Sequence, residues 1–526
     1  MTTTTSTPTH EKRTVLLVFA ALMLVMLLAS LSQTVLSTAL PTIVGSLDGA
    51  DHIAWVMTAY LLGMTVTMPM YGRLGDRLGR KPLLLLAIVL FTIGSLVGAL
   101  AQDMTVLIAG RAVQGLGGGG LMVLSQAAIA DVVPARDRGK YMGILGAVFG
   151  LSSVAGPLLG GWFTEGPGWR WTFWINVPLG VIAFVAVVLL LQKPVVERAK
   201  TRVDYLGMAL LAIATSALIL AATWGGHQYD WDSAQIIGLA VVAVAGAIAF
   251  VFVERKAQEP VMPLGLFRDR NFNLTTVGVI ILGVTMFGSL SYLPTYLQMS
   301  VGVDATHAGL MMIPMMGGML VTSITVGQMV SRTGRYRWFP IAGAVVTGLG
   351  LFLLSTIEIG DSRLQIEASL LVLGIGIGLG MQILTLIVQN SFSHRIVGTA
   401  TAANNFFRQV GGTLGAAAVG SVFTSRLTDS LATKLPQSGS GGGSSSLTPD
   451  LVSQLPDEVR DIVVNAYNDA LMPIFLWLVP MTIVSAVVLW FVHEKPLKHT
   501  IESSKKDESI GEHALDATDA MAGAER

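Results

Sequence analysis

Fourteen long apolar runs dominate this chain of 526 residues. Each run is about 20 residues long, the length that an α-helix needs to cross the hydrocarbon core of a bilayer. A backbone inside lipid must satisfy its own hydrogen bonds, so we interpret the runs as transmembrane helices of an all-α polytopic membrane protein. We expect the spans at 14–40, 53–71, 82–101, 105–129, 141–163, 172–191, 205–224, 234–253, 272–297, 307–330, 338–357, 366–390, 399–425 and 470–492.

The composition excludes several other classes of protein. Charged residues make up 13% of the chain and the formal net charge is zero, so nothing favours a nucleic-acid partner. The chain has no cysteine, which rules out disulfides and thiolate metal sites. A Walker A sequence is also absent, and we therefore expect no metal, no cofactor and no direct use of ATP.

The lysines and arginines predict the orientation. With the N-terminus inside the cell, 26 of the 33 basic residues fall in inner segments, five in outer loops and two, Arg111 and Arg408, within spans. Cytoplasmic loops of membrane proteins carry an excess of Lys and Arg. Both termini are therefore predicted to be cytoplasmic, in a multi-pass protein of the inner (plasma) membrane.

An internal repeat divides the spans. Shifting the sequence by 255 residues lays 52–80 over 307–335 without a gap, and ten of the 29 positions are identical. Both segments run from outside to inside, as expected of parallel repeats. The chain then divides into two six-helix halves with two helices inserted between them. The expected parts are a cytoplasmic N-terminus at 1–13, a first half at 14–191, an insertion at 192–270, a second half at 271–492 and a disordered cytoplasmic tail at 493–526.

The outer loop at 426–469 is the longest expected outside the membrane. It contains a Gly/Ser-rich tract at 437–446, which is typical of a flexible linker. A short amphipathic helix is expected to follow from Asp457. The loop is interpreted as a solvated segment, with a docking site for an outer partner protein as the alternative.

Five motifs identify a family. They are GRLGDRLGRK at 72–81, RAVQG at 111–115, a glycine-rich pattern from Gly146 to Gly161, WRWTFWINVPLG at 169–180 and DYLG at 204–207. Together they resemble signatures of the major facilitator superfamily and of its fourteen-helix drug:proton antiporter branch, the EmrB/QacA type. The resemblance implies the major facilitator fold, alternating access and export of amphipathic drugs in exchange for protons.

The 72–81 segment is predicted to be a latch between the two halves. Its glycines allow sharp turns and close helix approach. A carboxylate near arginines and helix N-termini forms charge-assisted bonds that would hold the outward-open state. The alternative is a charge run that only sets topology. The latch candidates are Gly72, Gly75, Asp76, Arg77, Gly79, Arg80 and Lys81.

The fourth and fifth spans carry further candidates. An arginine in a span is costly and normally faces a cavity or a partner, although Arg111 lies near enough to the outer side to extend to that interface. The resemblance implies a role for Arg111, Gln114 and Gly115 in proton coupling or gating. The fifth span is expected to form a hinge between halves, or simply to pack closely. Its motif comprises Gly146, Gly150, Gly156, Pro157, Gly160 and Gly161.

Polar and aromatic residues within spans are candidates for a substrate cavity. They suit amphipathic neutral or anionic molecules, because no acidic residue lies deep in a span to attract cations. Any single aromatic has helix or lipid packing as its alternative. The candidates are Ser32, Gln33, Thr34, Phe287, Tyr292, Tyr296, Asn404, Asn405 and Arg408.

The first span departs from the family pattern, which usually has an aspartate where this chain has Ser32. A serine cannot carry a proton near neutral pH. The remaining carriers are Asp76, Asp131, Glu165 or the substrate itself, and two outer histidines, His52 and His307, titrate in a suitable range.

The predicted partners are a small-molecule substrate, protons and the lipid bilayer. Export of one endogenous metabolite, antibiotic or lipid is the main alternative to drug export. A membrane enzyme acting on lipids is a remote alternative, because the sequence shows no cluster of His, Asp and Glu near one interface.

Overall fold

The computed structural model of the chain describes residues 8–47, 52–191, 203–226, 228–434, 452 and 455–497. Within these ranges the regular elements are helices, apart from one isolated bridge between Gly225 and Tyr229. Twelve of the described helical stretches are long and apolar enough to cross a membrane. The all-helical membrane architecture is thereby confirmed. Each of the fourteen expected spans falls on one helix or on two consecutive helices.

The described residues of the first half form seven helices, in which the sixth span is broken at Ile175. Their bounds are α1 Pro8–Ser46, α2 Ile53–Leu78, α3 Arg80–Ala99, α4 Met104–Val132, α5 Ala135–Glu165, α6 Trp171–Trp174 and α7 Asn176–Leu190. The insertion follows as a helical hairpin. Its helices are α8 Tyr205–Trp224 and α9 Ala234–Lys256, and a 3₁₀ turn, η2 Leu264–Arg268, leads out of it.

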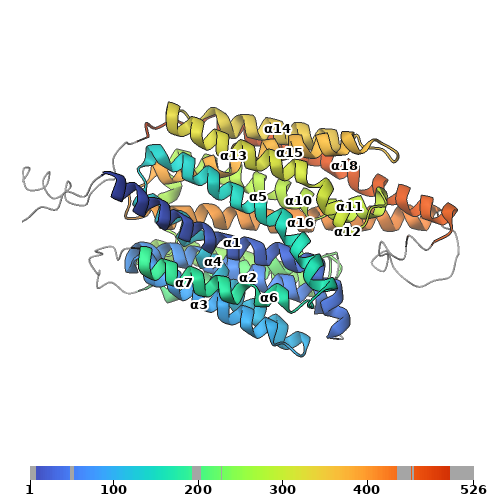
Figure 1. Cartoon of the computed structure of the whole chain (residues 1–526), viewed down its shortest axis with the longest axis horizontal. Coiled ribbons are helices and arrows are strands. Elements are labelled where there is room, and N and C mark those ends of the chain that lie inside the picture. Colours follow the sequence, from blue (N-terminus) through green and yellow to red (C-terminus); the bar gives the residue numbers. More distant parts are fainter. Residues whose placement is uncertain are drawn as a thin grey trace, which may run out of the picture.

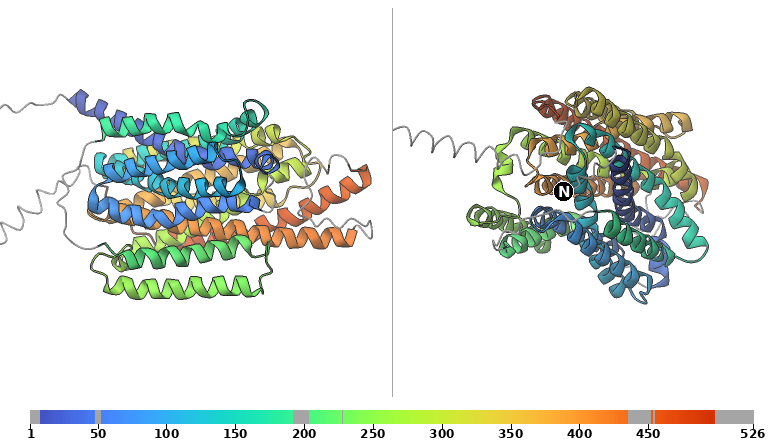
Figure 2. Two further views of the ribbon diagram at one scale, coloured as in Figure 1. Left: turned by 90° about the horizontal axis from the view of Figure 1, so that it is seen from below. Right: turned by 60° about the vertical axis from the view of Figure 1, so that its left-hand side comes forward.

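The second half repeats the pattern of the first. Its helices are α10 Arg270–Leu290, α11 Leu293–Ser300, α12 Ala305–Met311, α13 Ile313–Thr333, α14 Trp338–Ser355, α15 Arg363–Ser391, α16 Val397–Lys434 and α18 Asp457–Trp490. Most of the blue-to-cyan helices lie on one side of the bundle and the yellow-to-red helices on the other (Figure 1). The hairpin of α8 and α9 lies at the edge, where α8 packs on α2 and α16 (Figure 2).

The two repeated segments occupy equivalent places. The first repeat forms α2, which packs across the midline against α16, and the second forms α12 and α13, of which α13 packs against α5. Each repeat therefore contacts the opposite half. Such reciprocal contacts are expected when two related halves each place the equivalent helix at the interface that they share.

Polar caps begin many of the helices. A side-chain oxygen at the N-cap accepts a hydrogen bond from a backbone N–H that would otherwise have no partner. Such caps explain why helices start just after short polar segments of an otherwise apolar chain. The capping residues are Asp103 for α4, Asp204 for α8, Ser233 for α9, Asp269 for α10, Asp304 for α12 and Ser362 for α15.

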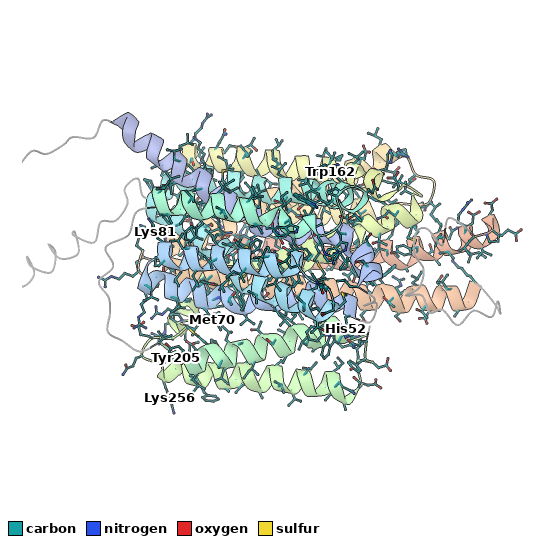
Figure 3. The ribbon with its side chains drawn as sticks, turned by 60° about the horizontal axis from the view of Figure 1, so that its bottom comes forward. His52, Met70, Lys81, Trp162, Tyr205 and Lys256 are labelled. Atoms are coloured by element: carbon teal, nitrogen blue, oxygen red, sulfur yellow. The ribbon has the colours of Figure 1, made fainter. Side chains whose placement is uncertain are left out.

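Both ends of the described chain lie at the same end of the bundle (Figure 1), which we call the terminal end. Lys81, Tyr205 and Lys256 also lie there, whereas His52 lies toward the opposite end (Figure 3). The start of the expected disordered tail is held against the bundle. Asn271 Nδ2 donates to His493 O at 2.8 Å, and Leu497 is buried. The rest of that tail, 498–526, lies outside the described residues.

At the opposite end, α16 and α18 extend beyond the other helices (Figure 1). The expected outer loop at 426–469 is therefore partly helical. Its first residues belong to α16, and the short helix expected from Asp457 is the first part of the 34-residue α18. Lys434 Nζ pairs with Asp469 Oδ2 at 3.0 Å, which joins the two extensions. The tract at 437–446 lies outside the described residues.

Candidate functional site

The 72–81 segment is almost entirely helical, where the sequence predicted a loop. Helix α2 continues to Leu78 and α3 begins at Arg80, so Gly79 alone separates them. Gly79 has φ 88° and ψ 148°, a region almost restricted to glycine, where a residue with a side chain would be strained by about 1–3 kcal/mol. One glycine therefore makes the whole turn.

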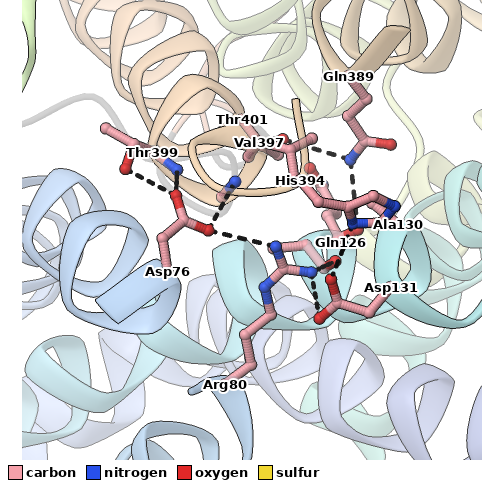
Figure 4. Close-up of polar contacts among 12 residues, drawn as sticks. Asp76, Arg80, Gln126, Ala130, Asp131, Gln389, His394, Val397, Thr399 and Thr401 are labelled. Carbon is pink, nitrogen blue, oxygen red and sulfur yellow. Dashed lines mark hydrogen bonds and ion pairs between the residues drawn. The ribbon is translucent and has the colours of Figure 1, made fainter. Parts of the chain in front are cut away.

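The Asp76 carboxylate joins the two halves at the terminal end. It accepts hydrogen bonds from Gly398 N at 3.0 Å, from Thr399 N at 2.6 Å and from Thr399 Oγ1 at 2.8 Å. These donors lie in the first turn of α16 (Figure 4). The free N–H groups and the dipole of a helix N-terminus favour a negative charge. Asp76 of the first half is thus bound by the start of a second-half helix.

Asp76 belongs to a row of charged side chains. Arg80 Nη2 lies 3.2 Å from Asp76 Oδ1, and Arg80 Nη1 lies 2.5 Å from Asp131 Oδ2. Arg80 also donates to Ala127 O. Beyond it, His394 Nδ1 lies 3.4 Å from Asp131 Oδ1 (Figure 4). We call Asp76, Arg80, Asp131 and His394 the latch row. His394 was not among the predicted latch residues, because nothing in its local sequence marks it.

Gly72 allows α2 to approach α16. A methyl group at Gly72 would overlap Ala402 Cβ and lie 2.9 Å from Gly398 O. Gly75 is similarly close to Leu124 of α4. Of the remaining motif residues, Arg77 lies in the last turn of α2, and Lys81 Nζ donates to Val188 O of α7 at 2.7 Å.

A second junction lies at the position related by the repeat. The 255-residue shift places Ser331 where the first half has Asp76. Ser331 Oγ accepts a hydrogen bond from Lys140 N at 3.1 Å, near the start of α5. Arg136 Nε donates to Ser331 O at 2.8 Å, and Arg136 Nη2 to Arg332 O at 2.6 Å. The halves are therefore joined at both junctions of the terminal end, through a carboxylate at Asp76 and through a hydroxyl and backbone carbonyls at Ser331 and Arg332.

Amide side chains continue the contact between halves toward the middle of the bundle. Asn405 Nδ2 donates to Gln126 Oε1 at 2.8 Å, which connects α16 to α4. Gln389 Nε2 lies 3.3 Å from both Gln126 O and Thr401 Oγ1. Asn405 was predicted as a cavity residue, whereas Gln126 and Gln389 were not singled out. The signal in the sequence that could have identified these two glutamines is an amide side chain within an apolar run.

Arg408 lies one helical turn beyond Asn405. Its side chain is buried, and its Nη2 donates to Asn405 Oδ1 at 2.6 Å. Asn404 Oδ1 accepts a bond from Thr385 Oγ1 at 3.5 Å, while its Nδ2 has no hydrogen-bond partner among the described residues. In the described part of the chain, no carboxylate pairs with Arg408.

Arg111 is buried inside the first half. Its Nε donates to Val56 O at 3.2 Å and its Nη1 to Gln114 Oε1 at 2.6 Å, and its guanidinium lies 4.1 Å from the centre of the Tyr60 ring. Its exposed fraction is 0%, so this side chain does not extend to the outer interface. Among the described residues no carboxylate pairs with it, and its Nη2 has no hydrogen-bond partner.

Gln114 connects Arg111 to Ser32, the position where the family pattern has an aspartate. Gln114 Nε2 donates to Ser32 Oγ at 2.8 Å and to Ser95 Oγ at 2.7 Å. Gly115 lies against the backbone of Tyr60, so α2 and α4 approach closely here. Ser95 and Tyr60 complete this cluster, and neither was predicted.

The glycines of α5 divide between two neighbours. Gly146 lies beside Gln382 and Ser323 of the second half, and Gly150 beside Met319. By contrast, Gly156 and Gly160 lie against α1, where Thr34 Oγ1 donates to Ser152 O at 2.8 Å. Gly161 has no atom within 4 Å of the position a Cβ would take, and Pro157 lies inside the continuous α5. Of the predicted motif glycines, Gly146 and Gly150 thus face the interface between halves, as do Gly139 and Gly143 earlier in α5.

The structure places the predicted cavity residues in both halves. Ser32 and Thr34 bond within the first half, and Gln33 beside them is half-buried. In the second half, Tyr292 donates to Ala416 O at 3.1 Å, and Tyr296 donates to Asn468 Oδ1 at 2.8 Å. Phe287 packs against Gly412 of α16. A small pocket lies between α10, α14, α15 and α18, and none of the predicted residues lines it.

The sequence matches the model of the Major Facilitator Superfamily over residues 22–416. The chain belongs to this superfamily. Superfamily members are transporters rather than enzymes, so the chain is a multi-pass membrane transporter of small molecules. A membrane enzyme is excluded.

Two relatives from Bacillus subtilis extend over nearly the whole chain. The multidrug transporter protein MdtP is 34% identical over 93% of this chain and 94% of its own length. Multidrug resistance protein 3 is 34% identical over 96% of this chain and all of its own length. The proton:xylose symporter XylE has a similar fold, with a TM-score of 0.59 and 16% identity over 93% of this chain and 98% of its own.

Proposed function

We propose that the chain is a secondary exporter that moves amphipathic drugs or other small hydrophobic compounds out of the cell in exchange for protons. The observation that carries this proposal is the charged junction between halves, in which Asp76 binds the first turn of α16. A latch that joins two halves at one end only is useful to a carrier that opens each end in turn. The names of the two Bacillus relatives supply the substrate class.

The exporter is proposed to have fourteen spans, arranged six, two and six as in the EmrB/QacA branch. Helices α2 and α16 supplement the twelve apolar stretches, and they are 26 and 38 residues long. Both lie at the interface between halves, where polar residues such as Asp76 and Arg408 face protein rather than lipid. Their lower hydropathy follows from that position. The terminal end is proposed to face the cytoplasm of a plasma-membrane protein.

The buried charges favour neutral or anionic amphipathic substrates. Arg111 and Arg408 are the charges that the described spans hold deep in the bundle, and neither has a carboxylate partner there. A cation would gain nothing from such a lining, whereas an anionic group would. Asp76 and Asp131 at the terminal end are the proposed proton-binding carboxylates. One charge crossing about 150 mV releases about 3.5 kcal/mol, enough for roughly a 300-fold substrate gradient.

Export of a single endogenous metabolite, antibiotic or lipid is the second candidate. The extensions of α16 and α18 favour it, because they present a protein surface beyond the other helices to which an outer partner would bind (Figure 1). Deleting residues 437–446 would impair export only if binding of an outer partner to that surface depends on this segment. Unchanged export of a drug panel after the deletion would support the first candidate.

Proteoliposomes test the proposal directly. Purified protein is reconstituted, and efflux of a panel of dyes is followed with an imposed pH gradient, with a voltage, and with an uncoupler. We expect efflux that the uncoupler abolishes. Efflux that ignores both gradient and voltage would refute proton exchange.

The substitution Asp76→Asn distinguishes a latch role for Asp76 from a role of the 72–81 charges in topology alone. A charge-assisted hydrogen bond contributes about 1.5–3 kcal/mol, so its loss should reduce efflux by about tenfold or more. Asp103→Asn is the matched control, because Asp103 only caps α4 and asparagine caps equally well. Equal rates for the two variants would show that Asp76 only sets topology.

A further inference from the structure

We propose that His394 makes the junction between halves sensitive to cytoplasmic pH, holding the terminal end closed when the cytoplasm is acidic. The inference rests on the proposed function in one respect, that the terminal end faces the cytoplasm and opens during transport. It adds a residue that neither the family motifs nor the predicted site contains.

The position of His394 is the first argument. It lies in the short segment between α15 and α16 of the second half, and its partner Asp131 lies near the end of α4 in the first half. The two side chains therefore bridge the halves, with Nδ1 3.4 Å from Oδ1. The side chains of His394 and Asp131 are 27% and 39% exposed, so protons from the solvent reach them.

The other charged groups leave one carboxylate oxygen of Asp131 to the histidine. Arg80 occupies Oδ2 of Asp131 and also binds Asp76 (Figure 4). From α5, Arg138 donates to Ala130 O at 2.7 Å and to Val133 O at 3.0 Å, which places a second cation beside the end of α4. Arg395 is exposed on the same segment as His394.

The sign of the effect follows from these charges. A protonated imidazole attracts the Asp131 carboxylate, whereas a neutral ring at 3.4 Å makes only a weak contact with it. The bridge between halves is therefore stronger at low pH and weaker at high pH. Imidazole is the side chain whose charge changes between about pH 5 and pH 8. Acidification of the cytoplasm would thus favour the closed state and slow further proton entry.

A distance measurement across the junction tests this without any substrate. Leu78 and Thr333 are exposed, occupy the equivalent last turns of α2 and α13, and belong to different halves. Because the chain has no cysteine, Leu78→Cys and Thr333→Cys give a single pair for spin labels. The full-length protein in lipid nanodiscs is measured by double electron–electron resonance from pH 5.5 to pH 8.

We expect the ratio of short to long distances to fall about fivefold as the pH rises, the change that a partly exposed ion pair of about 1 kcal/mol produces. His394→Gln should flatten this titration, and His394→Arg should hold the short distance at every pH. Asp131→Asn should flatten it as well. His493→Gln is the matched control, because this exposed histidine at the same end bonds Asn271 through its backbone.

A titration that survives in His394→Gln, or that is lost in His493→Gln, would overturn the proposal. So would a ratio that does not change with pH in the parent protein. His394→Arg keeps the test valid if the glutamine variant does not fold. Failure of the proposed export function gives a different result, namely an intact distance titration in a protein that moves no dye across proteoliposomes.

Discussion

At the scale of single residues, the buried cations define the chemistry of the bundle. Arg111 is enclosed by Gln114, Val56 O and the Tyr60 ring rather than by a carboxylate. A neutral amide stabilises the charge of the Arg111 guanidinium less than a carboxylate would. We therefore expect Gln114 to be important for stability as well as for transport. Its second contact, with Ser32, occupies the place where an aspartate is usual in the family.

Gln114→Leu should lower the free energy of unfolding by about 1–3 kcal/mol, since it removes a hydrogen-bond partner from a buried charged group. Gln114→Glu should restore most of this stability by placing a carboxylate beside Arg111. Thermal unfolding in detergent measures both. The control is Gln102→Leu, at an exposed position before α4. A Gln114→Leu variant as stable as that control would contradict this account of Arg111.

At the scale of helices, the close contact of α2 with α16 depends on a glycine, which has no side chain to hold the two helices apart. Gly72 lies where a methyl group would overlap Ala402, so the two helices meet at backbone distance beside the Asp76 junction. The same approach lets the Asp76 carboxylate reach the amides of Gly398 and Thr399. Helix packing and latch geometry are therefore coupled.

Gly72→Ala should push α2 away from α16 and open the terminal end, because overpacking of this kind costs about 1–3 kcal/mol. The expected result is a larger fraction of long distances between labels at Leu78→Cys and Thr333→Cys. Gly317→Ala is the matched control on α13, since no atom lies within 4 Å of its Cβ position. If both substitutions leave the distances unchanged, close approach at Gly72 is not what holds the latch.

At the scale of the whole molecule, the two halves meet through unequal junctions. The first repeat contributes Asp76 and Arg80 of the latch row, whereas the second contributes Ser331 and the backbone carbonyls that Arg136 binds. The charged junction responds to protonation and the neutral one does not. The pH-dependent change is therefore expected at α2 and α16, where the terminal end opens as the pH rises, with the junction of α5 and α13 acting as a pivot.

The orientation of the molecule is tested by labelling single cysteines on intact cells. Gln102→Cys should react with a maleimide that cannot cross membranes, and Thr333→Cys should react only after permeabilisation. The absence of native cysteines makes each signal specific. The physical reason is the excess of Lys and Arg in the segments at the terminal end. The reverse pattern of labelling would invert the topology and with it the direction proposed for the latch.

Much of this architecture follows from the sequence alone, because it depends on local properties. Apolar runs of about 20 residues must form helices in lipid, and all fourteen runs lie on helices of the structure. The repeat at 52–80 and 307–335 predicted related halves, and the motif at 72–81 predicted Asp76 as a junction residue. The superfamily was predicted correctly from these motifs. Helix ends were less predictable, since Gly72 and Gly75 continue α2 where a loop was expected.

The partners of these residues were decided by tertiary structure. Asp76 and Gly398 are 322 positions apart, and Gln126 and Asn405 are 279 apart. Hydropathy and motif spacing describe one segment at a time, so they do not indicate which helix faces which. The rotation of each helix is set by packing across the interface, and glycines such as Gly72 determine how close that packing is. His394 became a candidate only when folding placed it beside Asp131.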